Sequence, residues 1–236
     1  MSRKGSSLYI SAPVNALVEG LYREDTLVRD ILEQGDFGIG TFNDLDGEMV
    51  VVDGRVYQLR ADGLSHDVPD EARTPFACVT FFRPYSFEDL DQPLDYAQLI
   101  DILDRMVPSK NMLYAIRLEG HFDYVRTRSV PRQDAYKPLV EVTREQPEFE
   151  FENVRGTMVG FWTPDFLSSV AVPGYHLHFL TEDCQRGGHL LTCKPHGIRV
   201  SLQHMPNIQL GLPMTLDYLT QGFDRDIQAD LNEAEH

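Results

Sequence analysis

The spacing of apolar positions divides the chain into a few helices and many strands. Apolar side chains recur at helical spacing in segments 14–21 and 27–32, which predicts two short helices. The same spacing over residues 95–106 predicts a longer amphipathic helix that begins at Asp95. Apolar runs on either side of Asp53-Gly54 predict a β-hairpin over residues 49–60, because this dipeptide favours a two-residue turn.

Runs of β-branched and aromatic residues predict that the rest of the fold is mainly sheet. Segment 131–147 contains Pro131, Pro138 and Pro147 and is typical of a connection, where we expect any division between two sheets. The expected fold class is α+β (mixed α/β), dominated by strands, with two packed β-sheet subdomains and a few helices. Residues 1–236 should form a single unit, with a subdivision into 1–145 and 146–236. The predicted strands are 76–82, 112–119, 122–130, 149–162, 175–181, 188–193 and 198–204.

Composition narrows the classes of partner. The chain has 236 residues and a formal net charge of −16, whereas binding to DNA or RNA needs clustered Lys and Arg. We therefore expect no nucleic acid and no anionic membrane surface as partners. No run of about 18 apolar residues occurs, and residues 1–30 do not resemble a secretory signal. Cys78, Cys184 and Cys193 fit no disulfide scaffold, which favours reduced thiols and a cytoplasmic location.

Three histidines lie close together in segment 174–189. If residues 175–181 form a strand, His176 and His178 project from one face, because side chains two apart point the same way. Gly187-Gly188 indicates that the chain turns back, and a four-residue loop, 182–185, would place His189 opposite His178. Three imidazoles with an open fourth position are typical of a catalytic zinc site, where the metal acts as a Lewis acid or activates water.

The same residues allow other interpretations. The histidines could be unrelated residues on a polar sheet face, or could hold a zinc ion that stabilises a binding protein, although a structural zinc site normally has four protein ligands. His176-x-His178-x-x-x-Glu182 also resembles the first motif of the cupin barrels, which include metal-dependent oxygenases and lyases. The glycine and the second histidine motif of a cupin are missing at the required spacing. The other histidines, which we assign to the surface or to packing, are His66, His121, His196, His204 and His236.

Several ordered motifs, which run from about Leu8 to the C-terminus, carry a family resemblance. They are Gly-Asp-Phe-Gly-Ile-Gly-Thr-Phe-Asn-Asp-Leu-Asp-Gly-Glu (35–48), Phe-Phe (81–82), Pro-Ser-Lys-Asn-Met-Leu-Tyr-Ala-Ile-Arg (108–117), Arg-Thr-Arg (126–128), Lys-Pro-Leu-Val (137–140), Gln-Pro (146–147), Gly-Thr-Met-Val-Gly-Phe-Trp-Thr-Pro (156–164) and Gly-Tyr-His-Leu-His-Phe (174–179). Together they resemble the alpha-acetolactate decarboxylase family. The resemblance implies a homodimeric carboxy-lyase that converts the small molecule 2-acetolactate into acetoin and carbon dioxide, in acetoin biosynthesis on the butanediol pathway.

The resemblance also assigns site residues. It implies that the three histidines bind Zn²⁺, and that the family's active-site arginine corresponds to Arg128. Its pocket carboxylates correspond to Glu48 and, in the tail, to Glu235, while Thr41 matches a further pocket position. The tail match is short, and a shift of two residues would select Glu233 instead. Composition alone predicts a frayed acidic end for residues 224–236, so the two lines of reasoning disagree there.

The chemistry of the substrate suggests a role for each group. Loss of carbon dioxide leaves a carbanion that must delocalise into the neighbouring ketone as an enediolate, and zinc would stabilise that charge. We expect Arg128 to pair with the substrate carboxylate, Glu48 to handle a proton and Glu235 to close the pocket. Arg126 lies two residues before Arg128, so strand periodicity places both on one face, and an exposed basic pair is the alternative interpretation.

Overall fold

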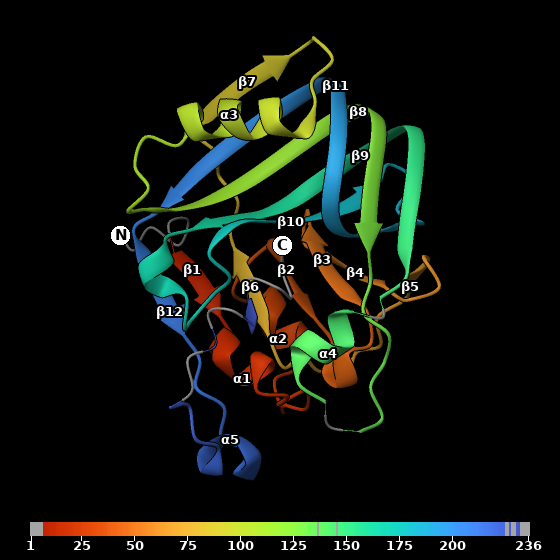
Figure 1. Cartoon of the computed structure of the whole chain (residues 1–236). Coiled ribbons are helices and arrows are strands. Elements are labelled where there is room, and N and C mark those ends of the chain that lie inside the picture. The colour runs from red at the N-terminus through yellow and green to blue at the C-terminus, as the bar shows by residue number, and fades with distance from the viewer. Residues whose placement is uncertain (1–6, 136, 145, 225–226, 228–229, 232–236) are drawn as a thin grey trace.

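The computed structural model contains two β-sheets that pack against each other, with short helices around them (Figure 1). It describes residues 7–135, 137–144, 146–224, 227 and 230–231. The helices within these residues are α1 (Val14–Val18), α2 (Val28–Leu32), α3 (Tyr96–Met106), α4 (Leu139–Thr143) and α5 (Leu216–Thr220), with 3₁₀ turns η1 (Asn43–Leu45) and η2 (Asp165–Leu167). None of them is long and apolar enough to cross a membrane.

The first sheet has seven strands in the order β12-β1-β6-β2-β3-β4-β5. Neighbouring strands are antiparallel except β1 and β12, which run parallel although they lie at opposite ends of the sequence. The strands are β1 (Ser7–Ile10), β2 (Phe37–Thr41), β3 (Glu48–Val52), β4 (Arg55–Leu59), β5 (Ser65–His66), β6 (Ala77–Thr80) and β12 (Asn207–Leu210).

The second sheet has the order β10-β9-β8-β11-β7, and β10 also pairs with β11. Because of this additional pairing, β8, β9, β10 and β11 form a closed ring, while β7 pairs with β11 outside the ring. Phe122, Phe151 and Phe179 fill the enclosed space, with ring centroids 5.6–5.7 Å apart for the two pairs that Phe179 makes. The strands are β7 (Ser86–Leu90), β8 (Leu113–Arg128), β9 (Glu148–Thr163), β10 (Gly174–Thr181) and β11 (Gly187–Met205).

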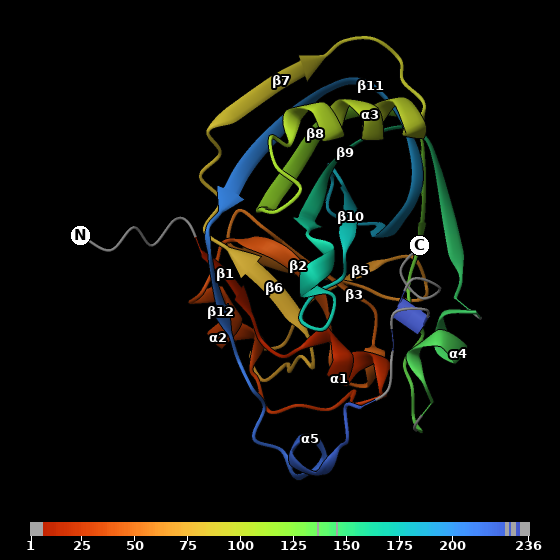
Figure 2. The same ribbon diagram turned by 60° about the vertical axis from the view of Figure 1, so that its left-hand side comes forward.

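The main hydrophobic core lies between the sheets. Phe37 of the first sheet meets Phe161 of the second edge to face, with ring centroids 6.2 Å apart. The opposite face of the second sheet is covered by α3, whose Leu99 and Leu103 are fully buried (Figure 2). Asp95 caps this helix in a capping box with Gln98, which satisfies backbone donors at its first turn. The helix begins where the sequence predicted.

The hairpin predicted over residues 49–60 is present as β3 and β4. Asp53 and Gly54 both have positive φ, 52° and 76°, as a two-residue type I′ turn requires. Strands 112–119 and 122–130, however, form one strand, β8, and strands 188–193 and 198–204 form one strand, β11. Bulges in the pairing of β8 with β11 absorb the irregular positions, so glycine and proline bend these strands without ending them.

The expected division between sheets at segment 131–147 is wrong. β7 and β8 precede this segment but belong to the second sheet, while β12 follows it and belongs to the first. The reason is long-range pairing that local sequence patterns do not report: β12 pairs with β1, and β7 and β8 pair with β11. The subdivision into residues 1–145 and 146–236 therefore does not follow the sheets.

Candidate metal centre and pocket

The three clustered histidines converge as their spacing predicted. His176 and His178 lie two residues apart on β10, and His178 is paired directly with His189 on β11. Each offers one ring nitrogen to a group whose ligand atoms all lie within 4.8 Å of one another, and the ring centroids are 5.0–5.4 Å apart. His178 and His189 are only 1% and 5% exposed. This is the spacing of imidazoles that can share one metal ion.

The register of this hairpin follows from its turn. The backbone N–H of Thr181 donates to the carbonyl of Arg186 at 2.9 Å, which leaves the predicted four-residue loop, 182–185. Asp183 stabilises the loop by accepting hydrogen bonds from the Thr181 hydroxyl at 2.6 Å and from the Gln185 backbone at 3.1 Å. Gly188, with φ 150°, admits the close approach of β8, because a Cβ there would lie 2.5 Å from the carbonyl oxygen of Arg128.

His178 is held in the protonation state that a metal ligand needs. Its Nδ1 lies 2.9 Å from the carbonyl oxygen of Met49, which can only accept, so Nδ1 carries the proton and Nε2 has a free lone pair. Burial lowers the pKa of His178 well below its usual value, and the neighbouring His176 lowers it further. His178 Nε2 is buried and has no hydrogen-bond partner among the described residues. A neutral imidazole nitrogen that makes no hydrogen bond to the described residues and faces two other histidines fits a bound cation.

Arg128 lies beside the histidines at the end of β8. It is paired with His189 across the sheet, and its Nη2 is 3.5 Å from His189 Nε2. Arg126 differs from it: its side chain is 41% exposed and its Nη1 lies 3.6 Å from Glu148 Oε2. A cavity lies between the two sheets next to the histidines. Of the two arginines, Arg128 lines this cavity and Arg126 does not.

Glu48 and Thr41 approach the histidines from the other sheet. They are paired across β2 and β3, and both side chains line the cavity. Glu48 is only 8% exposed, and its Oε2 lies 3.5 Å from His178 Nε2. The Thr41 hydroxyl donates to the carbonyl of Gly47 at 2.7 Å, which fixes the turn that leads into Glu48.

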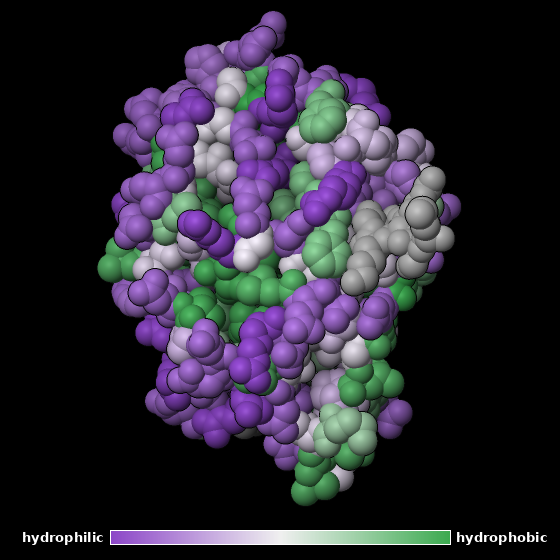
Figure 3. Space-filling view, turned by 180° about the vertical axis from the view of Figure 1, so that it is seen from behind, coloured by the Kyte–Doolittle hydropathy of each residue, from purple (hydrophilic) through white to green (hydrophobic). Residues whose placement is uncertain are grey.

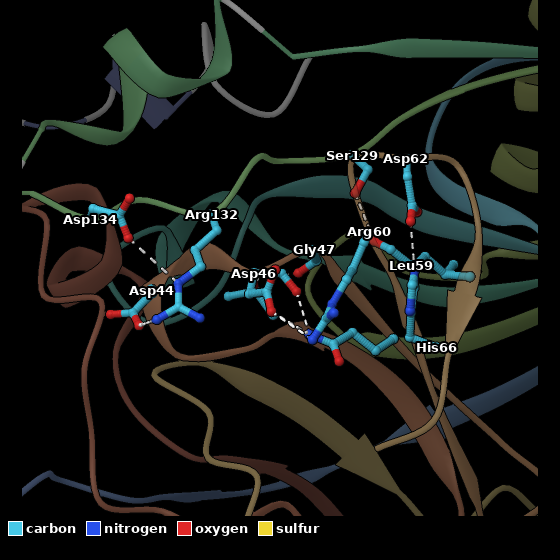
Figure 4. Close-up of polar contacts among 12 residues, drawn as sticks. Asp44, Asp46, Gly47, Leu59, Arg60, Asp62, His66, Ser129, Arg132 and Asp134 are labelled. Carbon is cyan, nitrogen blue, oxygen red and sulfur yellow. Dashed lines mark hydrogen bonds and ion pairs between the residues drawn. The ribbon is translucent and has the colours of Figure 1, made fainter. Parts of the chain in front are cut away.

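A network of polar contacts joins the chain after Arg128 to the turn before Glu48 (Figure 4). The Ser129 hydroxyl donates to the carbonyl of Leu59 at 2.7 Å, and Arg132 Nη2 lies 3.0 Å from Asp44 Oδ2. Arg60 Nη2 is 2.9 Å from Asp46 Oδ2 in the same region. The contacts of Ser129 and Arg132 tie the segment after β8 to β4 and η1, and the contact of Arg60 holds the end of β4 against the turn before β3. Together they set the positions of Arg128 and Glu48 relative to each other.

The cavity between the sheets is small, with a volume of about 40 Å³. That is room for only a few water molecules, and hence for a small ligand. Gln146 also lines it, and its Nε2 is buried without a hydrogen-bond partner among the described residues. No role was predicted for Gln146 beyond its place in a family motif. The other lining residues not expected from sequence are Leu17, Gly40, Leu45, Phe76, Val130, Leu139 and Thr143.

The tail is only partly within the described residues. Ile227 and Leu231 are buried, at 7% and 1% exposure, in the same hydrophobic cluster as Leu17 and Leu139 of the cavity wall. The frayed end predicted from composition is therefore wrong for these two residues. Burial of their apolar side chains stabilises the packed conformation, although most neighbouring residues in the sequence are acidic or polar. Glu233 and Glu235 lie outside the described residues.

Glu182, the last residue of the cupin-like motif, is not near the histidine group. Its carboxylate lies in the exposed loop between β10 and β11, 3.1 Å from Arg155 Nε. Glu182 therefore behaves as a solvated loop carboxylate, and the motif match to cupins does not extend to a shared ligand set.

Comparisons with known sequences and with solved structures all find similarity to one protein family. The sequence model of the family described as alpha-acetolactate decarboxylase matches residues 8–225. The alpha-acetolactate decarboxylase of Methylococcus capsulatus is 40% identical over 237 aligned positions, which cover 100% of this chain and 91% of that protein. A crystal structure of the alpha-acetolactate decarboxylase of Bacillus subtilis superposes with a TM-score of 0.94 at 39% identity, and covers 98% of this chain and 99% of that one. A structure from Staphylococcus aureus, described as similar to this decarboxylase, gives a TM-score of 0.93 at 27% identity.

The histidine group generates a direct prediction. Replacing His176, His178 or His189 by alanine should lower the metal content of the purified chain well below one ion per molecule, because two imidazoles hold a divalent ion far less tightly than three. Elemental analysis after dialysis against metal-free buffer, which removes weakly bound surface ions, measures this. His204→Ala, on the same strand as His189 but in an edge-to-face contact with Tyr85 instead, is the matched control and should keep its metal. Full occupancy in any of the three variants would remove that residue from the ligand set.

Proposed function

Since the chain belongs to the alpha-acetolactate decarboxylase family and is a carboxy-lyase, we propose that it decarboxylates 2-acetolactate to acetoin with a zinc ion held by His176, His178 and His189. The observation that carries the metal part is the buried, neutral His178 Nε2, which lacks a hydrogen-bond partner among the described residues and faces the two other imidazoles. Three nitrogen ligands with room for a further ligand suit a catalytic zinc rather than a structural one.

Zinc, when bound there, supplies a Lewis acid that stabilises the negative charge which develops on the ketone oxygen as carbon dioxide leaves. The residues of the chain would exclude water, orient the substrate and handle a proton. The cavity is closed on one side by apolar residues such as Leu17, Val130 and Leu139, which limit the access of water to the reacting carbon. A small, largely apolar cavity with a few charged groups therefore suits a substrate of few atoms.

Arg128 is the group that we propose to bind the substrate carboxylate. It lines the cavity next to His189, and its planar guanidinium can contact both oxygens of a carboxylate. Such a contact holds the carboxylate in one orientation, and so selects the bond to be broken. Gln146 Nε2 offers a further buried donor on the same cavity wall.

Glu48 is the group that we propose to manage a proton. It faces His178 from the opposite sheet and is nearly buried, so its carboxylate lies beside both the histidine group and the cavity. From that position it can take the hydroxyl proton of the substrate or return one to the enediolate. Thr41 supports this placement through its hydrogen bond to Gly47.

Measurement of gas release and product tests this function against its alternatives. With racemic 2-acetolactate we expect stoichiometric carbon dioxide and acetoin, loss of activity after chelation, and recovery on addition of zinc. Consumption of oxygen would instead support a cupin-like oxygenase. Bound zinc without turnover would leave a zinc-stabilised binding protein, and either result would overturn the proposal.

The two arginines at the end of β8 give a matched pair of variants. Arg128→Lys should keep its metal but lose roughly 10- to 100-fold in kcat/KM, because a hydrogen bond to a charged group contributes about 1.5–3 kcal/mol. Arg126→Lys should stay close to the wild type, since Arg126 pairs with Glu148 outside the cavity. Steady-state kinetics of both variants makes the comparison. Equal losses would contradict the role of Arg128.

A second pair of variants tests the tail. We propose that Glu235 reaches the pocket, supported by the burial of Ile227 and Leu231 beside the cavity wall. Glu235→Gln should then slow turnover strongly while zinc content stays unchanged, and Glu233→Gln should have little effect. Single-turnover rates and elemental analysis measure the two quantities. A loss confined to Glu233→Gln would shift the assignment by two residues, and no loss in either variant would exclude the tail from the chemistry.

We also propose that the chain is a homodimer and works in the cytoplasm. Apolar side chains gather on and before α5, a patch visible at the lower end of the molecule in Figure 3. Met214→Asp combined with Leu216→Asp should shift sedimentation towards the monomer, whereas Phe166→Asp, an exposed residue elsewhere, should not; a monomeric wild type would contradict the proposal. The exposed apolar residues of the patch are Leu212, Met214, Leu216 and Leu219.

The free thiols of Cys78, Cys184 and Cys193 are consistent with the proposed cytoplasmic location, which is a reducing compartment.

A further inference from the structure

A second group of ligating side chains lies on β8 and β11, at the place where these two strands bend, so it shares only β11 with the first group. β8 and β11 lose their regular register around Pro195, and β11 turns sharply there (Figure 1). Gly120 and Gly197 have φ of 146° and 86°, and a Cβ on Gly120 would lie 2.3 Å from the carbonyl oxygen of Gly197. Bulges of this kind redirect side chains, and they often occur next to functional sites.

The bulge brings two histidines and a carboxylate together. Asp123 Oδ1 lies 3.2 Å from His196 Nδ1 and 3.7 Å from His121 Nδ1. The two imidazole rings are 6.1 Å apart, and the three ligand atoms nearest one another fall within 4.8 Å. The sequence assigned both histidines to the surface or to packing, because residues 121 and 196 are far apart in the chain and only the pairing of β8 with β11 joins them.

These distances are close to those between ligand atoms that bind the same cation. Nitrogen and oxygen ligands about 2.0–2.2 Å from a tetrahedral zinc ion lie roughly 3.3 Å from one another. The two distances from Asp123 lie on either side of that value. His121 Nδ1 also lies 3.3 Å from the backbone carbonyl oxygen of His196, so the His121 ring must rotate out of that contact for all three groups to reach one ion. We propose that His121, Asp123 and His196 form a second metal site, for a first-row divalent cation that prefers imidazole, such as Zn²⁺.

The surrounding residues allow such an ion to bind and determine how tightly it is bound. The side chains of His121, Asp123 and His196 are 32%, 40% and 46% exposed, so water can complete the coordination and the site is weaker than the buried one. Arg155 is paired with His121 across the sheet, but its guanidinium contacts Glu182 at 3.1 Å, which offsets its charge. The net charge of the chain, −16, also favours a cation at the surface.

The second site is separate from the catalytic group. His121 precedes Arg128 by seven residues on β8, and His196 follows His189 by seven on β11. Seven residues of strand correspond to roughly 23 Å of chain, although the bend shortens the direct path. An ion at the bend would therefore join β8 to β11 without contact with the substrate, and its loss should leave turnover unchanged.

Zinc stoichiometry of the intact enzyme tests the proposal. The enzyme with its catalytic metal is dialysed against micromolar zinc, and bound metal is counted by elemental analysis. We expect one ion per chain more in the wild type than in His196→Ala, His121→Ala or Asp123→Asn, and full activity in all four proteins. His66→Ala is the matched control, because His66 forms a similar partly exposed pair with a single carboxylate, that of Asp62, and should keep the wild-type count.

A thermal measurement provides the second readout. Added zinc should raise the Tm of the wild type and of His66→Ala, and should leave the Tm of the three site variants nearly unchanged, because only an ion that binds the folded chain stabilises it. Equal zinc counts in the wild type and the site variants would overturn the proposal, as would an equal shift in Tm. The difference in zinc count between the wild type and the site variants does not depend on whether the buried histidines bind zinc, so failure of the proposed function and failure of the second site are distinguishable.

Discussion

The hydrogen bond between His178 Nδ1 and the carbonyl of Met49 connects the two sheets at the group of three histidines. It reaches from β10 to β3, whose first residue is Glu48, so one contact orients an imidazole and positions the strand that carries the carboxylate. The backbone carbonyl leaves Nδ1 protonated and directs Nε2 towards the other histidines. Because His178 is 1% exposed, water cannot replace that partner, and the two sheets must pack correctly for the metal group to exist.

Burial then determines what the group can bind. A buried imidazole resists protonation, and the pKa of His178 is lowered well below its usual value for that reason. A neutral ring competes less with protons for a metal ion than an ordinary surface histidine does. The partly exposed group at His121, Asp123 and His196 lacks this advantage, so the surface site that we propose would bind a metal ion more weakly than the buried histidine group.

Local chemistry in the sequence was enough to predict some of these features. The Asp53-Gly54 turn and the four-residue loop 182–185 fix their hairpins by backbone geometry alone, and the second of these determined that His189 faces His178. Strand β2 was missed because its glycines resemble a loop, although they let β2 pack between β3 and β6. Gln146 and the buried positions of Ile227 and Leu231 depend on contacts with distant segments, and no local pattern reports such contacts.

The parallel pairing of β1 with β12 joins Ser7 to Asn207, and this has a consequence for synthesis of the chain. At about 5–20 residues per second, a ribosome needs roughly 10–40 seconds to make the 200 residues between them. During that time β1 can pair with β6 on one side only, and its other edge stays open to strands from neighbouring nascent chains. Conditions that slow translation or crowd the ribosomes should therefore increase aggregation before the sheet is complete.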